Sequence, residues 1–333
     1  MTDSHLTPHT SPLTPHTSHL TPPTSPLTPH PSPLTPSLPL QTSPFSYATA
    51  FSRNLGLVSE VEQERLRKAR VAIAGMGGVG GVHAVTLARL GVGKFHVADR
   101  DAFEVANFNR QAGATMATVG HNKAQVMAGQ IRQINPESDV RVWNEFITEE
   151  NIDEFLEGCD VVLDGIDFFS IGARRLLFAE ARRRGLWVVT AGPIGFSTAW
   201  LVFDPNGMSF DEYFDLRDDQ SEHEQLAAFA VGLTPQATHL RYIDLGRVDL
   251  GEARGPSLAL ACQLASGVAA AEVVKILLGR GTTRPAPWYH QFDAYRLKYR
   301  SGKLRLGNRG PWQRLKRQII ARRFANPNAA PAK

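Results

Sequence analysis

The sequence predicts an α/β fold with a mostly parallel sheet, helices on both faces, and a C-terminal antiparallel strand segment that extends the sheet. Three observations support this prediction. Short apolar runs alternate with helix-like stretches between residues 70 and 192, as in βα units. The first apolar run ends in a glycine-rich turn. Residues 288–306 alternate between polar and apolar side chains, which is typical of a strand pair, and we expect its turn at Ser301-Gly302.

The glycine-rich turn lies between a short strand and a helix. The apolar run 71–74 predicts a buried parallel strand, residues 82–91 predict a helix that ends at Gly91, and residues 94–99 predict a second strand ending on Asp99. Such a turn lets the backbone approach a phosphate at a helix N-terminus, and the acid can hold a ribose hydroxyl. The pattern is therefore Rossmann-like and predicts nucleotide binding, with the turn glycines Gly75, Gly77, Gly78 and Gly80.

Polar and charged residues after the second strand indicate which nucleotide is bound. Asp99 and Asp101 lie together at the strand end, and Asn107, Arg110 and Lys123 follow. A dinucleotide dehydrogenase needs one acid for the ribose and has no use for two cations at this place. A triphosphate needs fixed cations if its α-phosphorus is to be attacked, so the residues favour ATP as the cofactor.

The order G-x-G-G-x-G, D-x-D, N-x-x-R-Q and G-x-x-K resembles the ThiF/MoeB-type adenylyltransferases, the bacterial relatives of ubiquitin-activating enzymes, over about residues 50–295. The resemblance implies a cytoplasmic homodimer that adenylates a carboxylate. It assigns Asp99 to the ribose, Asn107 and Arg110 to the phosphates, and Lys123 to the β- and γ-phosphates. It also implies that Arg53, in the sequence FSRN, reaches the ATP of the partner subunit; the alternative is a surface arginine.

Residues 139–146 predict the third strand and 160–167 the fourth, with Asp167 at its carboxyl end. Ligands of open α/β sheets bind at this edge, so Asp167 is a candidate ligand of Mg²⁺. The alternative is an N-cap for a helix over 170–184. The family usually has Asn after this Asp, whereas this chain has Phe168. Either Asn144 or Glu145 is expected near the adenine or ribose.

The remaining elements follow from local patterns. Ser59 and Glu62 form a predicted capping box before the first strand. Residues 257–278 are apolar nearly all round and predict a helix buried against the sheet or in a dimer interface. Between residues 207 and 255 the pattern breaks down, and the family resemblance implies a crossover that shapes the acceptor-binding face. A helix over 121–135 and strands over 187–192 and 197–205 complete the expected elements.

Composition divides the chain into three parts. Residues 1–44 contain a seven-residue, proline-rich repeat, which predicts a disordered tail. Residues 45–306 are predicted to form the nucleotide-binding domain, and residues 307–333 a basic C-terminal helix and tail. Residues 294–333 hold 12 Lys and Arg and no acid, whereas residues 1–293 hold 24 basic and 32 acidic residues. The helix over 311–324 has Pro at its start and an apolar face; it either binds an anionic partner or is a partly docked tail.

The chain has two cysteines, Cys159 and Cys262. We therefore expect no disulfide framework, and we expect the protein to be in a reducing compartment. The paired C-x-x-C motifs that hold structural zinc in many ThiF-type proteins are absent from the sequence. Cys262, among Ala and Leu, is predicted to be a core residue rather than a thioester nucleophile. His290 is expected to be packed rather than catalytic. No apolar run suggests an integral membrane segment.

The predicted reaction is ATP-dependent adenylation of an acceptor carboxylate, which gives an acyl-adenylate and pyrophosphate. Two other classes remain open. A NAD-dependent oxidoreductase would use Gly75 to Asp99 but leave Arg110 and Lys123 without a role. A non-catalytic scaffold would be expected to lose the cations that this chain keeps. The acceptor itself, whether a ubiquitin-like or sulfur-carrier protein, a small acid or a modified tRNA base, is left open by the sequence.

Overall fold

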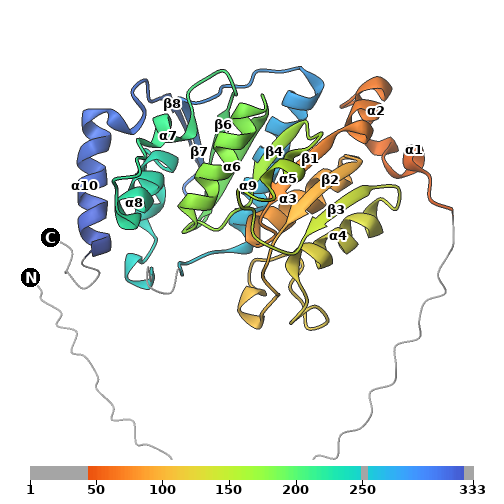
Figure 1. Cartoon of the computed structure of the whole chain (residues 1–333), viewed down its shortest axis with the longest axis horizontal. Coiled ribbons are helices and arrows are strands. Elements are labelled where there is room, and N and C mark those ends of the chain that lie inside the picture. The colour runs from red at the N-terminus through yellow and green to blue at the C-terminus, as the bar shows by residue number, and fades with distance from the viewer. Residues whose placement is uncertain (1–43, 249–253, 326–333) are drawn as a thin grey trace, which may run out of the picture. The chain divides into compact units, whose positions relative to one another are not determined.

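The computed structural model describes residues 44–248 and 254–325. The predicted tail, apart from residue 44, lies outside the described residues, as does the end of the chain after residue 325. The described residues from Phe45 onward form one compact unit, and Figure 1 shows its sheet lying between helices.

A single eight-stranded sheet organises this unit, in the order β3-β2-β1-β4-β5-β6-β7-β8. The first five strands of that order pair in parallel, and the last three are added antiparallel. The predicted fold class is therefore confirmed. The strands are β1 (Arg70–Ala74), β2 (Lys94–Ala98), β3 (Asp139–Trp143), β4 (Val161–Asp164), β5 (Trp187–Ile194), β6 (Ser197–Phe203), β7 (Trp288–Asp293) and β8 (Lys298–Lys303).

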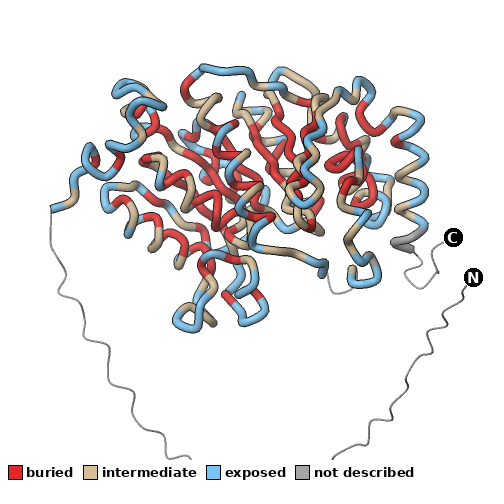
Figure 2. The backbone as a smooth tube through the Cα atoms, turned by 180° about the vertical axis from the view of Figure 1, so that it is seen from behind, coloured by how far each residue is buried: buried red, intermediate tan, exposed pale blue. Residues whose placement is uncertain are grey.

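Helices cover both faces of the sheet because successive strand residues point to opposite sides. In β1, Val71 and Ile73 pack with helices α3, α4 and α9, whereas Ala72 and Ala74 pack with α5 to α8. Figure 2 shows the buried residues along the strands and the inner sides of the helices. The α-helices are α1 (Tyr47–Ala50), α2 (Glu60–Lys68), α3 (Gly78–Arg89), α4 (Lys123–Ile134), α5 (Ile152–Leu156), α6 (Ile171–Arg183), α7 (Phe210–Phe214), α8 (Glu222–Leu233), α9 (Ala259–Leu278) and α10 (Pro311–Ala325).

Short 3-10 helices complete the described elements: η1 (Ser52–Asn54), η2 (Val105–Asn107), η3 (Thr238–Arg241), η4 (Leu245–Arg247) and η5 (Gly307–Arg309). The predicted capping box is present at the start of α2, where the Ser59 hydroxyl accepts from the Glu62 amide and the Glu62 carboxylate accepts from the Ser59 amide. Polar caps of this kind satisfy the amides that the first helical turn leaves free.

The predicted turn at Ser301-Gly302 is wrong. Both residues lie within β8, where Ser301 pairs with His290 and Gly302 with Tyr289, and the chain reverses at residues 294–297. A Cβ atom on Gly302 would lie 2.7 Å from the Tyr289 hydroxyl oxygen. The glycine therefore makes room for a cross-strand ring rather than for a turn.

Helix α9 packs against β5, β6 and α3, so the prediction that it is buried on the sheet holds. By length and composition α9 is the one helix among the described residues that could cross a membrane, and 44% of its most apolar window is buried inside the protein. Cys262 in α9 is fully buried. Burial raises the pKa of its thiol, and that of Cys159 to about 12.

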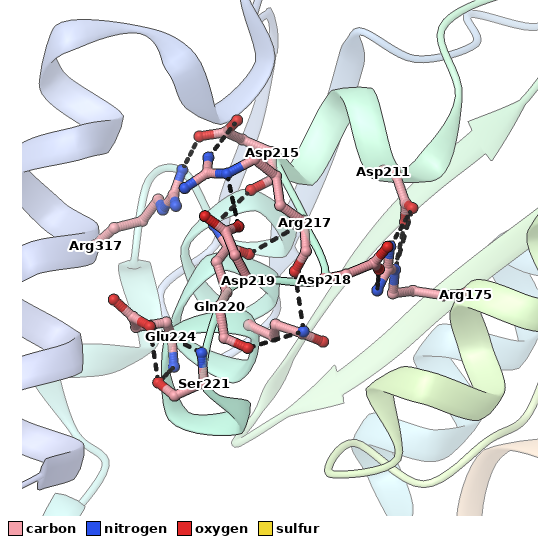
Figure 3. A network of polar contacts seen from close by, with 11 residues as sticks. Arg175, Asp211, Asp215, Arg217, Asp218, Asp219, Gln220, Ser221, Glu224 and Arg317 are labelled. Carbon is pink, nitrogen blue, oxygen red and sulfur yellow. Dashed lines mark hydrogen bonds and ion pairs between the residues drawn. The ribbon is translucent and has the colours of Figure 1, made fainter.

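Helices α7 and α8 lie in the region 207–255 where the sequence pattern breaks down, and α10 packs on α8. Ion pairs join this region to α6 and α10: Arg175 of α6 pairs with Asp211 and Asp218, and Arg317 of α10 lies 2.5 Å from a carboxylate oxygen of Asp215 (Figure 3). The Arg317 pair helps to hold α10 against this region.

Helix α10 docks by its polar face. Gln313 donates to the Val231 carbonyl at 3.3 Å and the Lys316 amine to the Pro235 carbonyl at 2.7 Å. The expected apolar face is largely exposed, with Trp312 75%, Leu315 47% and Ile319 56% accessible. The helix is therefore partly docked, and the binding of an anionic partner by its exposed side stays a prediction.

Candidate active site

The glycine turn after β1 is shaped by close backbone contacts. Gly75 has a φ of +90°, and a Cβ atom there would collide with the carbonyl of Gly165, which follows β4. A Cβ on Gly80 would collide with the Gly75 carbonyl. These two glycines let β1, α3 and the β4 end approach one another. Gly77 and Gly78 at the start of α3 line a cavity, and the amides of a helix N-terminus bind anions there.

Asp99 follows β2 and is tied to the glycine turn. One carboxylate oxygen accepts from the Met76 amide at 2.7 Å, and the other accepts from the Asp101 amide at 2.8 Å. Burial raises the pKa of Asp99, opposed by these two hydrogen bonds. Each oxygen keeps a second lone pair, and Asp99 lines the cavity, so the fixed carboxylate can accept from a ligand hydroxyl.

Lys123 and Asp101 form an ion pair in the cavity wall. The Lys123 amine lies 3.1 Å from an Asp101 carboxylate oxygen, and the Lys123 amide donates to the Asp101 carbonyl at 2.8 Å. The lysine side chain is only 10% exposed, whereas that of Asp101 is 56% exposed. This pairing holds the buried cation at the start of α4.

Arg110 and Asn107 line the same cavity. The Arg110 guanidinium donates to the Ala106 carbonyl at 3.1 Å and to the Asn109 side chain at 3.0 Å, leaving other N–H groups for a ligand. The Asn107 amide oxygen accepts from the Glu104 backbone, so Asn107 also caps η2.

Gln111, the last residue of the N-x-x-R-Q motif, is 7% exposed, and its side-chain oxygen has no partner among the described residues. It lines the cavity beside Gly77. The sequence motif contains this residue but predicts no role for it. A buried acceptor without a partner costs free energy, so a ligand donor at this place would be stabilising.

Sequence reasoning missed the buried pair at the end of β4. Asp164 accepts from the Arg174 guanidinium at 2.7 Å and from the Thr190 hydroxyl at 2.8 Å. Arg174 also donates to the carbonyls of Ile166 and Asp167 and lies over the Phe229 ring. The arginine thereby fixes the loop after β4. The only sequence signal was an arginine on the inward face of the helix over 170–184.

Asp167 lies in the loop after β4 rather than in the strand, because β4 ends at Asp164. Its side chain is exposed and accepts from the Phe169 amide at 3.0 Å. It is not the N-cap of α6, which is Ser170. The second carboxylate oxygen makes no hydrogen bond within the described residues, and Asp167 lines the cavity. These features fit a single carboxylate ligand of Mg²⁺, which prefers few protein ligands and several water or phosphate oxygens.

The other residues considered from the sequence differ in whether they line the cavity. Glu145 lines the cavity, whereas Asn144 does not. Phe168 packs against Phe229 at a centroid distance of 5.3 Å, so the replaced family Asn is here an apolar contact. Arg53 lies exposed in η1 and is not part of the cavity wall.

His290 and Cys262, which were predicted to be packed residues, are both buried. His290 is buried, stacks on Trp200 and does not line the cavity, as expected for a packed histidine. Cys262 is a core residue, as predicted, and it also borders the cavity: its sulfur would lie 3.2 Å from a Cβ on Gly78.

The cavity has a volume of about 1750 Å³. Sites for single small molecules are typically roughly 300–1,000 Å³, so this cavity has room for a nucleotide and a second molecule. It lies at the carboxyl edge of β1, β2 and β4, where ligands of open α/β sheets bind. Fold and site together define a Rossmann-like α/β protein whose cavity is lined by the residues of the predicted nucleotide site.

Comparison with known proteins identifies the family. The pattern of the ThiF family matches residues 51–311, and the chain belongs to this family. It is 38% identical over 135 residues to the tRNA threonylcarbamoyladenosine dehydratase of Haemophilus influenzae, covering 40% of this chain and 51% of that protein. It is 30% identical over 143 residues to the sulfur carrier protein ThiS adenylyltransferase of Escherichia coli, covering 43% and 56%. The chain thus spans about half the length of these curated relatives.

Solved structures share the fold. Escherichia coli MccB with ATP has a TM-score of 0.58 at 19% identity, covering 81% of this chain and 73% of that one. The Escherichia coli tRNA N6-threonylcarbamoyladenosine dehydratase TcdA has a TM-score of 0.53 at 25% identity, covering 70% of this chain and 95% of that one. The names of the family's relatives include adenylyltransferases as well as dehydratases.

Proposed function

We propose that this protein adenylates an acceptor carboxylate with ATP and releases pyrophosphate. The observation that carries the proposal is the convergence of Lys123, Arg110 and the start of α3 on one cavity wall beside the fixed carboxylate of Asp99. A hydride-transfer enzyme would have no use for the two cations. The relatives' names include adenylyltransferases acting on a sulfur carrier protein, and TcdA and MccB have been solved with AMP and ATP.

Each residue has a defined task in this reaction. Asp99 accepts from a ribose hydroxyl. The first amides of α3, with Asn107 and Arg110, bind phosphate oxygens, and Lys123 neutralises the β- and γ-phosphates. An acceptor carboxylate oxygen attacks the α-phosphorus, the bond to the bridging oxygen breaks, and pyrophosphate leaves. No proton transfer is required, so positioning and charge carry the catalysis.

Mg²⁺, held by Asp167, would supply further charge neutralisation at the phosphates. Two other features are proposed with the reaction: a homodimer in which Arg53 serves the partner's site, and an anionic partner for the basic helix α10. The two cysteines are free and buried, which supports a reducing compartment such as the cytoplasm.

Exchange of labelled pyrophosphate into ATP, in the presence of candidate carboxylates, tests the proposal. Lys123→Ala and Arg110→Ala should each reduce exchange by about a hundredfold or more, while circular dichroism stays unchanged. Lys68→Ala is the matched control, because its side chain is 74% exposed on α2 and lies outside the cavity. Hydride transfer to NAD, or wild-type exchange in both site variants, would refute the proposal.

A further inference from the structure

The cavity extends well beyond the nucleotide residues. Its wall includes the end of α8, η3 and helix α10, through Leu233, Leu240, Lys316 and Ile319. Helix α10 packs on α8, on the opposite side of the molecule from β1 to β3 in Figure 1. The cavity therefore connects the glycine turn with the C-terminal helix, and its far part is separate from the predicted phosphate site.

The two parts of the cavity differ in charge. Among the residues that the structure describes, the acidic side chains that line the cavity come from residues 99–167. From Thr190 onward, the described lining residues are apolar or neutral, apart from His223, His239, Arg254 and Lys316. Burial lowers the pKa of His239 to about 4, so this imidazole is neutral at pH 7. Its Nδ1 has no hydrogen-bond partner among the described residues.

Lys316 is held in place but is not charge-compensated. Its amine donates to the Pro235 carbonyl at 2.7 Å and to the Gln313 side chain at 3.1 Å. An ammonium has three donors, so one N–H is left. No ion pair among the described residues includes Lys316, and burial lowers its pKa. A partly buried cation without a carboxylate partner favours an anionic ligand.

The neighbouring lining residues of α10 are apolar. Ile319 and Ile320 lie next to Lys316 on the cavity side of the helix, and Ile319 keeps 56% of its surface exposed. The helix is anchored by its polar contacts to Val231, Pro235 and Asp215. The apolar wall is therefore preformed rather than created by ligand binding, which lowers the ordering cost.

We propose that the part of the cavity lined by η3 and α10 is the acceptor subsite, and that it takes a carboxylic acid with an extended apolar body and a second anionic group that binds Lys316. Ile319 and Ile320 select the apolar body. The inference rests on the proposed function for the role of the subsite, because it places the acceptor's reacting carboxylate at the glycine turn. The binding chemistry follows from the lining residues alone.

Two simple acids test the subsite: octanoate, and octanedioate with its second carboxylate. Calorimetric titration without ATP should show that wild type binds octanedioate more tightly. Ile319→Gln should weaken the binding of both acids by about tenfold. Lys316→Gln should remove the preference for octanedioate by lowering its affinity about tenfold, as expected for the loss of a charge-assisted hydrogen bond. The affinity for octanoate should not change. Leu315→Gln is the matched control, because Leu315 is 47% exposed on α10 but does not line the cavity.

Equal binding of both acids by wild type and all three variants would overturn the inference, as would no binding of either acid by wild type. An effect of Leu315→Gln as large as that of Ile319→Gln would also overturn it. The titration needs no ATP, so its result does not depend on ATP binding. A failure of the protein to bind ATP would refute the proposed function but not the subsite. Urea denaturation of each variant checks that the fold is intact.

Discussion

Replacing Arg174 by Met tests the buried pair that fixes the loop after β4. The side chains of Arg174 and Asp164 are only 4% and 1% exposed, with a nitrogen–oxygen distance of 2.7 Å. Met keeps the length and apolar stem of the arginine but removes its charge and donors. Asp164 would then keep only the Thr190 hydroxyl and the Ile166 amide as donors.

The expected loss of stability follows from this burial. Removing one partner of a buried pair leaves an uncompensated charge and costs about 3–5 kcal/mol. The adjacent Arg175 offers a matched control: its partners Asp211 and Asp218 are 42% and 93% exposed. Exposed pairs contribute about 0–1 kcal/mol, so Arg175→Met should cost no more than this.

Urea denaturation of wild type, both single variants and the double variant Asp164→Asn/Arg174→Met measures the effect. The double variant should recover part of the loss, because it no longer buries an unpaired carboxylate. ATP affinity should fall in Arg174→Met even at temperatures where the protein is folded, since Arg174 holds the Ile166 and Asp167 carbonyls. If Arg174→Met cost less than about 1 kcal/mol, or no more than Arg175→Met, the reasoning would be refuted.

Four further predictions concern the two cysteines, the glycine turn and the proposed dimer. Cys262→Ser should keep pyrophosphate exchange, since adenylation needs no thiol; loss of a later acceptor step alone would indicate a thioester. Burial raises the pKa of the Cys159 thiol to about 12, so it stays protonated below that pH, and iodoacetamide at pH 8.5 should label it only after unfolding. Gly80→Ala should destabilise the fold by about 1–3 kcal/mol by urea denaturation, because its Cβ meets a backbone carbonyl; unchanged stability would contradict that contact. Mixed subunits of inactive Arg53→Ala and Lys123→Ala should regain roughly a quarter of wild-type exchange if the arginine acts across the interface, and none if it acts within its own chain.

The sequence by itself determined the nucleotide half of this protein. The strand, glycine turn, helix and acid between Val71 and Asp99 are contiguous, and the features that mark them are local: a continuously buried apolar run, a helix N-terminus and a strand end. Arg110 and Lys123 follow within one short stretch, so their place at the same sheet edge could be predicted from the chain order of parallel strands. The capping box at Ser59 was predictable for the same reason, since it depends on residues three apart.

Tertiary structure alone decided the rest, because it depends on contacts between distant residues. Asp164 and Arg174 look like ordinary residues of a strand end and a helix until their side chains are seen buried together. The Ser301-Gly302 dipeptide suggested a turn, but packing against Tyr289 keeps it in a strand. The amphipathic pattern of α10 did not reveal that its polar face docks, because the partners that satisfy Gln313 and Lys316 are backbone carbonyls of α8 and the loop after it, more than 80 residues earlier in the chain. Carbonyl acceptors have no residue-type signature, so no sequence pattern marks them.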